Sequence, residues 1–270
     1  MTAPPRPPID LLATDLDGTL FPIDDSPEFI EAMKDLRRVI ARHHLRVVFV
    51  TGRSFEHVLE GIARHDPPLP EAIICDVGTT IMTRNDDAFD RDPFYHQLLR
   101  GRLAEWTNDR LCDAAVGLET SIRPQGIEHQ SELKCSFYFD ATVREAVERR
   151  VRDWIDRDSV PVAVTLSIDP FDGRGMLDLL PHQVDKGSAL MYWTQRNGVD
   201  ASRVVFAGDT GNDIGAATIA ANVILPANAD DQLRAAAANG CGSVFQSRHR
   251  CTAGVNDGLN QLLRSAQPEV

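Results

Sequence analysis

Apolar residues in the first third of the chain alternate between short continuous runs and a helical spacing. The runs at 11–14, 45–50 and 72–75 are mostly Val, Ile and Leu, as is typical of strands covered on both faces. Residues 29–40 place apolar side chains at steps of three and four, the pattern of one helix face, and a second helix is expected over 55–64. Strands and helices in alternation, joined by short links, predict βαβ units and a parallel sheet.

The pattern changes in the middle third, between about residues 85 and 181. The elements predicted there are a helical stretch around 98–111, a half-exposed strand over 133–140, a helix opened by a Thr142–Glu145 capping box, and strands over 160–168 and 175–180. Helix, strand, helix and two strands in this order predict an α+β insert that is separate from the parallel sheet.

From Asp185 the alternation of strands and helices resumes. The elements expected in the last third are helices over 187–197 and 230–238, strands over 203–207, 222–225 and 243–245, and a closing helix after Thr252. The predicted fold class is therefore α/β. A Rossmann-like, doubly wound parallel sheet is formed by residues 1–84 and 182–270, and residues 85–181 are inserted as an α+β domain.

Composition argues against several functions. The formal net charge of −12 is the opposite of a nucleic-acid footprint, which needs clustered Lys and Arg. No apolar run reaches the roughly 18 residues of a membrane span, and the Pro-rich start lacks the apolar stretch of a secretory signal. The five cysteines are scattered, without Cys-x-x-Cys spacing, so no zinc site or disulfide framework is predicted and a cytoplasmic location is expected.

The first predicted strand runs into Asp15 and Asp17, two carboxylates that are followed by Gly18. The carboxyl ends of parallel strands are where such sheets bind ligands. Because neighbouring carboxylates repel each other, they need a cation or a shared proton, and a magnesium ion with a phosphate would satisfy this need. A chance Asp-x-Asp in a structural turn is the alternative interpretation.

Three further strand or helix edges carry polar groups of use to the same chemistry. Thr51-Gly52 offers a hydroxyl and backbone N–H groups at a helix start, which can bind anions. Lys186 offers a compact positive charge, and Asp209 and Asp213, with Asn212, offer oxygen ligands for a hard cation. Taken singly, these features could be a plain turn, a solvated lysine and charges that complement a helix dipole.

Together and in this order, these residues resemble the four motifs of the haloacid-dehalogenase-like (HAD) phosphatases. The motifs match at Asp15 and Asp17, at Thr51, at Lys186, and at Gly208–Asp213. The insert lies between the second and third motifs, which is the position of the type-two (C2B) cap. The resemblance covers nearly the whole chain, and it implies the HAD fold, a Mg²⁺ cofactor and hydrolysis of phosphomonoesters.

The resemblance also implies a role for each residue. Asp15 would be the nucleophile that forms an aspartyl-phosphate, and Asp17 would protonate the leaving oxygen and then activate water. The metal set would be Asp15, Asp17 through its backbone carbonyl, Asp209 and Asp213, of which Asp213 would orient metal-bound water. The phosphoryl oxygens would be held by Thr51, Gly52 and Lys186, with Asn212 in support.

Within this family, Leu177–Pro181 and Thr51–Ser54 look like the matching segments of sucrose-phosphate phosphatases. A disaccharide phosphate such as sucrose 6-phosphate is therefore the expected substrate. Gly18, Leu20 and Thr80 stand where plant and cyanobacterial sucrose phosphatases tend to have Asn, Trp and Glu. Mannosylfructose phosphate, glucosylglycerol phosphate and mannosyl-phosphoglycerate therefore remain open as alternatives.

Recognition of the leaving group is expected to come from the insert, which would close over the sheet and exclude water. The hydroxyl groups of a disaccharide call for hydrogen-bonding side chains, and the insert offers Gln130, Lys134, Ser136 and Arg174 near its strand edges. Lys134 is the first candidate because the resembling family also has a lysine there. An exposed lysine on the outer face of the insert's sheet is the alternative.

Three alternative functions can be weighed by the residues that each would require. A non-catalytic sugar-phosphate-binding protein would be favoured had Asp15 or Asp17 been replaced, and neither is. A response-regulator receiver lacks both the insert and the Asp-x-Asp-Gly-Thr spacing, and a dinucleotide-binding oxidoreductase would need Gly-x-Gly-x-x-Gly after the first strand. The expected partner is a small sugar phosphate, and a monomer is the working assumption because nothing in the sequence sets the oligomeric state.

Overall fold

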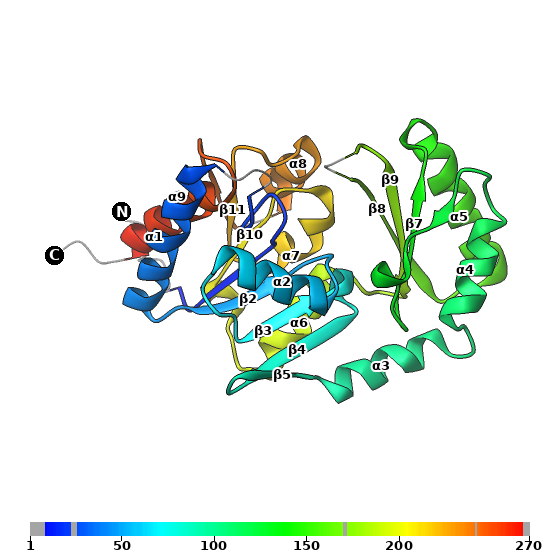
Figure 1. The fold of residues 1–270 in the computed structure, drawn as a ribbon, viewed down its shortest axis with the longest axis horizontal. Helices are drawn as coiled ribbons and strands as arrows, with labels where there is room; N and C mark the ends of the chain where they lie inside the picture. Colours follow the sequence, from blue (N-terminus) through cyan, green and yellow to red (C-terminus); the bar gives the residue numbers. More distant parts are fainter. Residues whose placement is uncertain (1–8, 23–25, 170–171, 241, 267–270) are drawn as a thin grey trace. The chain divides into compact units, whose positions relative to one another are not determined.

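A computed structural model describes residues 9–22, 26–169, 172–240 and 242–266 of the chain (Figure 1). The chain divides into two compact units. The first contains the chain up to Gly78, Met82–Asp90 and the chain from Lys186 onward, and the second contains Thr79–Ile81 and Arg91–Asp185. None of the described helices is long and apolar enough to cross a membrane.

An eight-stranded sheet with the order β12-β11-β10-β1-β2-β3-β4-β5 forms the centre of the first unit. Its strands are β1 (Leu11–Thr14), β2 (Arg46–Val50), β3 (Ala72–Cys75), β4 (Thr80–Asn85), β5 (Ala88–Arg91), β10 (Val204–Ala207), β11 (Asn222–Leu225) and β12 (Ser243–Gln246). The strands from β12 to β3 pair in parallel, which confirms the predicted α/β fold. Because β1 lies between β2 and β10, the winding of the chain reverses at β1, where such sheets bind ligands.

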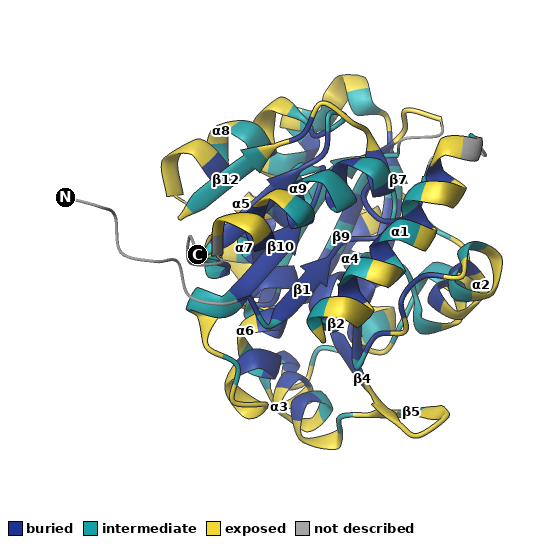
Figure 2. Cartoon of the chain, turned by 90° about the vertical axis from the view of Figure 1, so that its left-hand side faces the viewer, coloured by how far each residue is buried: buried dark blue, intermediate teal, exposed yellow. Residues whose placement is uncertain are grey.

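Helices cover this sheet. They are α1 (Pro27–His43), α2 (Phe55–His65), α6 (Lys186–Arg196), α7 (Ile214–Ile219), α8 (Asp231–Gly240) and α9 (Cys251–Ala266). Helix α1 packs against α9, and α6 packs against α7 and β3. In Figure 2, β1, β2 and β10 are drawn as buried between helices that expose their outer faces.

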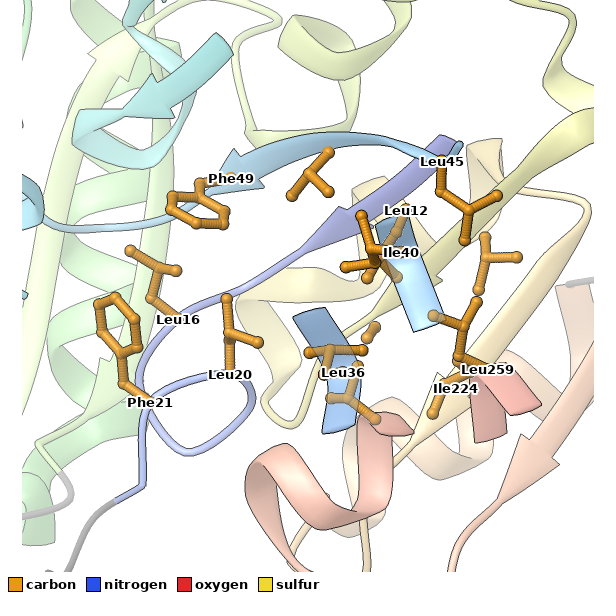
Figure 3. Close-up of a cluster of buried hydrophobic side chains, with 14 of the residues drawn as sticks. Leu12, Leu16, Leu20, Phe21, Leu36, Ile40, Leu45, Phe49, Ile224 and Leu259 are labelled. Carbon is orange, nitrogen blue, oxygen red and sulfur yellow. The ribbon is translucent and has the colours of Figure 1, made fainter. Parts of the chain in front are cut away.

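Segments far apart in the sequence share one apolar core in the first unit. Leu12 of β1 and Phe49 of β2 point toward the side of the sheet where Leu36 and Ile40 of α1 meet Leu259 of α9 (Figure 3). The same cluster buries Leu16, Leu20 and Phe21, which belong to the loop after β1. The apolar core therefore anchors the loop that carries Asp15 and Asp17.

The second unit is an antiparallel sheet with the order β6-β7-β9-β8 and three helices. Its elements are α3 (Pro93–Leu103), α4 (Asn108–Val116), β6 (Arg123–Pro124), β7 (Cys135–Phe139), α5 (Arg144–Asp158), β8 (Val162–Ile168) and β9 (Gly175–Pro181). Helix α3 packs on β9, α4 on β6 and β7, and α5 on β8. This is the α+β content predicted for the insert.

Two boundaries in the second unit differ from the sequence-based expectation. The helical stretch around 98–111 is two helices, because Ala104 adopts φ 52° and ends α3. The Thr107 side chain then caps α4 by accepting a hydrogen bond from the amide of Arg110. The strand expected over 133–140 is shorter and mostly buried rather than half-exposed, because α4 covers it. In the sheet of the first unit, the hairpin of β4 and β5 is a further element that the sequence pattern does not predict.

The predicted Thr142–Glu145 capping box is wrong. The carboxylate of Asp140 accepts hydrogen bonds from the amide and the hydroxyl of Thr142, at 2.9 and 2.7 Å, and so caps a short 3₁₀ turn. Helix α5 then begins at Arg144 with no side-chain cap. Asp140 thus takes the Thr142 amide, the donor that the Glu145 carboxylate would have accepted from in a capping box.

We predict that Leu36→Ala lowers the free energy of unfolding by about 2–5 kcal/mol, because it leaves a cavity in the core shared by α1 and α9. Leu36 is fully buried, whereas Ile30 on the same helix is 59% exposed. Urea denaturation of both alanine variants measures the difference. A loss from Ile30→Ala as large as that from Leu36→Ala would contradict this account of the core.

Candidate active site

The nucleophile candidate Asp15 directly follows β1 at the carboxyl end of the parallel sheet. Its amide donates a hydrogen bond to the carbonyl of Ala207 at 2.9 Å, which extends the pairing of β1 with β10 by one residue. The Asp15 side chain is almost completely buried. The chain then turns, so that Asp17 lies in a loop closed by the hydrogen bond from Gly18 N to Phe21 O at 2.9 Å.

Gly18 is required for this turn. It has φ +75°, and a Cβ built on it would lie 2.3 Å from Oδ2 of Asp209. A side chain at this position would therefore be strained and would also displace Asp209. The glycine lets the loop after β1 pass directly beside the loop after β10.

Lys186, the first residue of α6, links the carboxylates of Asp15 and Asp213 through its ammonium group. Its Nζ donates hydrogen bonds to Oδ1 of Asp15 at 2.7 Å, to Oδ1 of Asp213 at 2.7 Å and to Oδ1 of Asn212 at 3.0 Å. The side chain is 1% exposed, which overturns the interpretation of Lys186 as a solvated surface lysine. Gly187 permits this position, because a Cβ there would lie 2.3 Å from the Gly215 carbonyl oxygen.

Three buried carboxylates offer a site for a cation. Asp15, Asp209 and Asp213 each have a carboxylate oxygen within 4.8 Å of the others. Oxygen donors of this kind suit a hard divalent cation. The Lys186 ammonium offsets only part of their charge, so the donor set fits a divalent metal ion. The side chain of Asp17 is not a member of this group, and the metal role expected of its backbone carbonyl stays a prediction.

The pKa values of the buried carboxylates also indicate that the site favours a cation. Burial raises the pKa of Asp15 well above its usual range, and the neighbouring Asp213, Asp209 and Asp17 raise it further, against the effect of Lys186. Burial, followed by repulsion from Asp213, raises the pKa of Asp209 to about 7. Burial alone would lower the pKa of Lys186, but the two carboxylates it contacts outweigh burial and raise it.

Asp213 ties Lys186 to the loop after β10. Its Oδ1 accepts from Lys186, while its Oδ2 accepts from the amides of Asp209 at 3.0 Å and Thr210 at 3.2 Å. The carboxylate thus caps the backbone, as the helix-terminus interpretation expects, and binds the ammonium as well. Both of its oxygens are engaged, which makes Asp213 an organiser of the site.

Thr51 and Gly52 lie at the carboxyl end of β2. Thr51 is buried, and its hydroxyl accepts a hydrogen bond from the amide of Arg53 at 3.2 Å. Helix α2 begins only at Phe55, with Ser54 as its N-cap. The pair therefore forms a turn that precedes the helix, rather than the first turn of the helix itself.

Arg53 holds Asp17, a contact that the sequence interpretation missed. Its Nε and Nη2 donate to the two carboxylate oxygens of Asp17, at 2.8 and 2.5 Å. The guanidinium also donates to the carbonyl of His57 and lies 5.4 Å from the centroid of the Phe21 ring. A bidentate pair fixes the orientation of the carboxylate. The only sequence signal was the position of Arg53 directly after Thr51-Gly52.

Asn228 connects three segments around Asp209 and was also missed. Its amide donates to Oδ2 of Asp209 at 3.0 Å and to the carbonyl of Gly18 at 2.8 Å, and its oxygen accepts from the amide of Cys251 at 2.9 Å. Thr19 donates to the other oxygen of Asp209 at 3.0 Å. Asn228 follows β11, so the strand-end rule used for the other motifs could have identified it.

The second unit carries the residues predicted to bind the leaving group. Lys134 precedes β7 and is 4% exposed, which overturns the alternative of an exposed surface lysine. Ser136 on β7 is also buried, and its hydroxyl donates to Oδ1 of Asp178 at 2.5 Å. Ser136, Asp178 and Thr165 lie opposite one another on three neighbouring strands, so they form one polar row.

The other two candidates serve different contacts. The Gln130 side chain accepts from the amide of Ser136 at 2.9 Å and donates to its carbonyl at 2.7 Å, so it shapes the backbone before β7. Arg174 is exposed, lies 3.6 Å from the centroid of the Tyr138 ring and pairs with Asp172 at 2.6 Å. Neither side chain joins the polar row.

Comparison with known proteins identifies the family. The profile of the sucrose-6F-phosphate phosphohydrolases matches residues 8–262. The chain belongs to this family. A crystal structure of the sucrose-phosphatase from Synechocystis, in complex with sucrose and phosphate, superposes with a TM-score of 0.78 at 22% identity, covering 94% of this chain and 98% of the other. This likeness shows that the fold is shared.

Three curated relatives of this chain differ from one another in name and in how much of their length the chain spans. An HAD-like protein from Nitrosococcus oceani is 29% identical over 83% of this chain, which spans only 60% of that relative. The glucosylglycerol-phosphate synthase of Pseudomonas anguilliseptica is 30% identical over 76% of this chain, which spans 24% of it. The mannosylfructose-phosphate phosphatase of Agrobacterium fabrum is 26% identical, over 76% of this chain and 77% of that protein.

We predict that the metal-free protein loses stability as pH rises from about 4 to about 8. The unfolded chain releases the Asp209 proton near its ordinary pKa of 3.8, whereas the folded protein keeps it until about pH 7. Between these values the folded state binds more protons, so raising the pH favours unfolding.

Urea denaturation in a chelator at several pH values measures this effect. Asp209→Asn should show a weaker fall of stability with pH than the wild type, because the amide does not titrate. Added magnesium should also weaken it in the wild type by stabilising the charged carboxylates. Identical pH profiles for the wild type and Asp209→Asn in chelator would contradict the prediction.

Proposed function

We propose that this protein is a Mg²⁺-dependent phosphatase that hydrolyses a glycosyl phosphate. The observation that carries the proposal is the buried Lys186 ammonium, which bridges Asp15 and Asp213 beside Asp209. A lysine and three carboxylates at the switch point of a parallel sheet can hold an anionic phosphoryl group only if a cation balances the acids. Membership of a phosphohydrolase family supports the same reaction.

Different residues would bind the magnesium ion and the phosphoryl group. The Asp15 carboxylate, the backbone carbonyl of Asp17 and the Asp209 carboxylate would hold the magnesium ion, Asp213 would orient metal-bound water, and the ion would neutralise charge on the phosphoryl group. Lys186 contributes a fixed positive charge, because its raised pKa keeps it protonated. The hydroxyl of Thr51 and the backbone of Gly52 would contact phosphoryl oxygens at the adjacent strand end.

Hydrolysis proceeds through two displacements at phosphorus. A carboxylate oxygen of Asp15 attacks phosphorus, the bond from phosphorus to the sugar oxygen breaks, and Asp17 gives that oxygen a proton. A water molecule then attacks the aspartyl-phosphate, Asp17 accepts its proton, and inorganic phosphate leaves. Arg53 keeps Asp17 oriented in the same loop as Asp15.

The substrate class is argued from the second unit and from the relatives. The polar row of Ser136, Asp178 and Thr165, with Lys134 beside it, offers hydroxyl, carboxylate and ammonium groups to sugar hydroxyls. We propose a disaccharide phosphate, sucrose 6-phosphate first. The names of two relatives keep mannosylfructose phosphate and glucosylglycerol phosphate as the alternatives to test. No described contact favours a non-catalytic sugar-phosphate-binding protein, because both Asp15 and Asp17 are present.

A phosphate-release assay over a panel of glycosyl phosphates, with magnesium and with chelator, tests the proposed function. One glycosyl phosphate is expected to be hydrolysed far faster than the others, and only in the presence of a divalent cation. Release of phosphate at the same rate after exhaustive chelation would refute the metal role. Absence of turnover over the whole panel would refute the reaction.

We predict that Asp15→Asn abolishes turnover, because an amide cannot form the phosphorylated intermediate. The variant should remain folded, since the amide oxygen can still accept the hydrogen bond from Lys186 and far-ultraviolet circular dichroism should match the wild type. Asp10→Asn is the matched control, because Asp10 lies at the opposite end of β1 and pairs with Arg203 at 2.6 Å. Near-normal phosphate release by Asp15→Asn would refute the covalent mechanism.

We predict that Lys134→Ala raises KM for the disaccharide phosphate and leaves hydrolysis of p-nitrophenyl phosphate nearly unchanged. The small substrate carries no sugar hydroxyls, so it cannot use the contact that is removed. Steady-state kinetics on both substrates, with exposed Lys34→Ala as control, separates these effects. Equal losses on both substrates would assign Lys134 a role in folding or closure.

A further inference from the structure

Two cysteines that the proposed hydrolysis does not use lie together in the second unit. Cys112 is half-buried on α4, and Cys135 is buried on β7. Both thiols donate to the same residue: Cys112 Sγ lies 3.5 Å from Oδ1 of Asn108, and Cys135 Sγ lies 3.4 Å from the Asn108 carbonyl oxygen. Each thiol therefore lies against Asn108, and helix α4 packs on β7. The sequence did not predict this pair, because Cys112 and Cys135 lack Cys-x-x-Cys spacing.

The two sulfur atoms are chemically unequal. Cys112 is half-buried, and the Cys135 thiol beside it lowers its pKa, whereas Cys135 is buried, and the Cys112 thiol together with burial raises its pKa. An oxidant therefore reaches the sulfur of Cys112 first. An accessible thiolate beside a second thiol is the arrangement in which oxidation leads to a disulfide rather than to further oxidation.

We propose that Cys112 and Cys135 are a modification site, an oxidisable dithiol that a peroxide converts to a disulfide between α4 and β7. The Cys112 thiolate attacks one peroxide oxygen, the O–O bond breaks, and Cys112 becomes a sulfenic acid while the other oxygen leaves as water. The Cys135 sulfur then attacks the sulfur of Cys112, and the hydroxyl leaves as a second water. The pair loses two electrons and two protons, and the peroxide is the oxidant.

Asn108 connects this pair to the residue proposed to recognise the sugar. Its side-chain amide donates to the carbonyl oxygens of Ser131 at 2.6 Å and Lys134 at 2.8 Å. A disulfide removes both S–H donors from Asn108 and draws the sulfur atoms to about 2.05 Å. The turn that ends in Lys134 would then shift. This consequence rests on the proposed function, whereas the disulfide itself does not.

The experiment treats the reduced full-length protein with hydrogen peroxide and follows intact mass, free thiols and the peptide map. We expect the loss of two hydrogen atoms, the loss of two free thiols and a cross-linked peptide joining Cys112 to Cys135, all reversed by dithiothreitol. Cys112→Ser should abolish the cross-link. Cys75→Ala, which removes a buried thiol of β3, should leave it intact.

Oxidised wild type should also show a KM for sucrose 6-phosphate raised roughly threefold or more, with p-nitrophenyl phosphate hydrolysis unchanged. Peroxide that leaves all thiols free, or that yields sulfinic acid on Cys112 without a cross-link, would overturn the proposed site. A cross-linked protein with unchanged KM would overturn its link to Lys134. The mass measurement decides the modification even if sucrose 6-phosphate is no substrate.

Discussion

The burial of Lys186 among Asp15, Asp213 and Asn212 is the interaction on which the rest of the site depends. It joins the loop after β1, the start of α6 and the loop after β10, three segments with no continuity in the sequence. Removing one partner of such a buried pair typically costs about 3–5 kcal/mol, because a charge is left without compensation. The close packing of α6 on α7 at Gly187, where no side chain fits, is what carries the ammonium into this position.

The site remains acidic even with its lysine, and this imbalance links structure to chemistry. Burial and mutual repulsion raise the pKa values of Asp15 and Asp209, which shows that the folded chain holds more negative charge than it can stabilise alone. A divalent cation would relieve that excess and would also make the approach of an anionic substrate favourable. The carboxylates that weaken the metal-free protein are therefore the same ones to which the proposed reaction assigns roles. Thr19 and Asn228 hold Asp209 in place for this purpose.

The two units carry different parts of the chemistry. In the proposed function, the parallel sheet would hold the groups that act on a phosphoryl oxygen, and these could not distinguish one leaving group from another. The antiparallel sheet carries Ser136, Asp178 and Thr165 on one face, while Cys135 on the alternate positions of β7 contacts Asn108 of α4. In the proposed oxidation, a change at Cys135 would reach Lys134 through Asn108.

Local patterns along the sequence predicted the order of the elements and the residue types at each strand end. Apolar periodicity is a local signal, so β1, β2, β3 and the α/β class followed from it, as did the candidate residues from Asp15 to Asp213. Local signals failed where neighbours compete, as at Asp140, which takes the cap that Thr142 was expected to form, and at Ala104, which ends α3. The burial of Lys186 and Lys134, the contact of Arg53 with Asp17, and the contact of both Cys112 and Cys135 with Asn108 follow from the tertiary structure alone. These facts depend on strand register and on the close approach of helices, which bring together residues whose separation in the sequence carries no periodic signal.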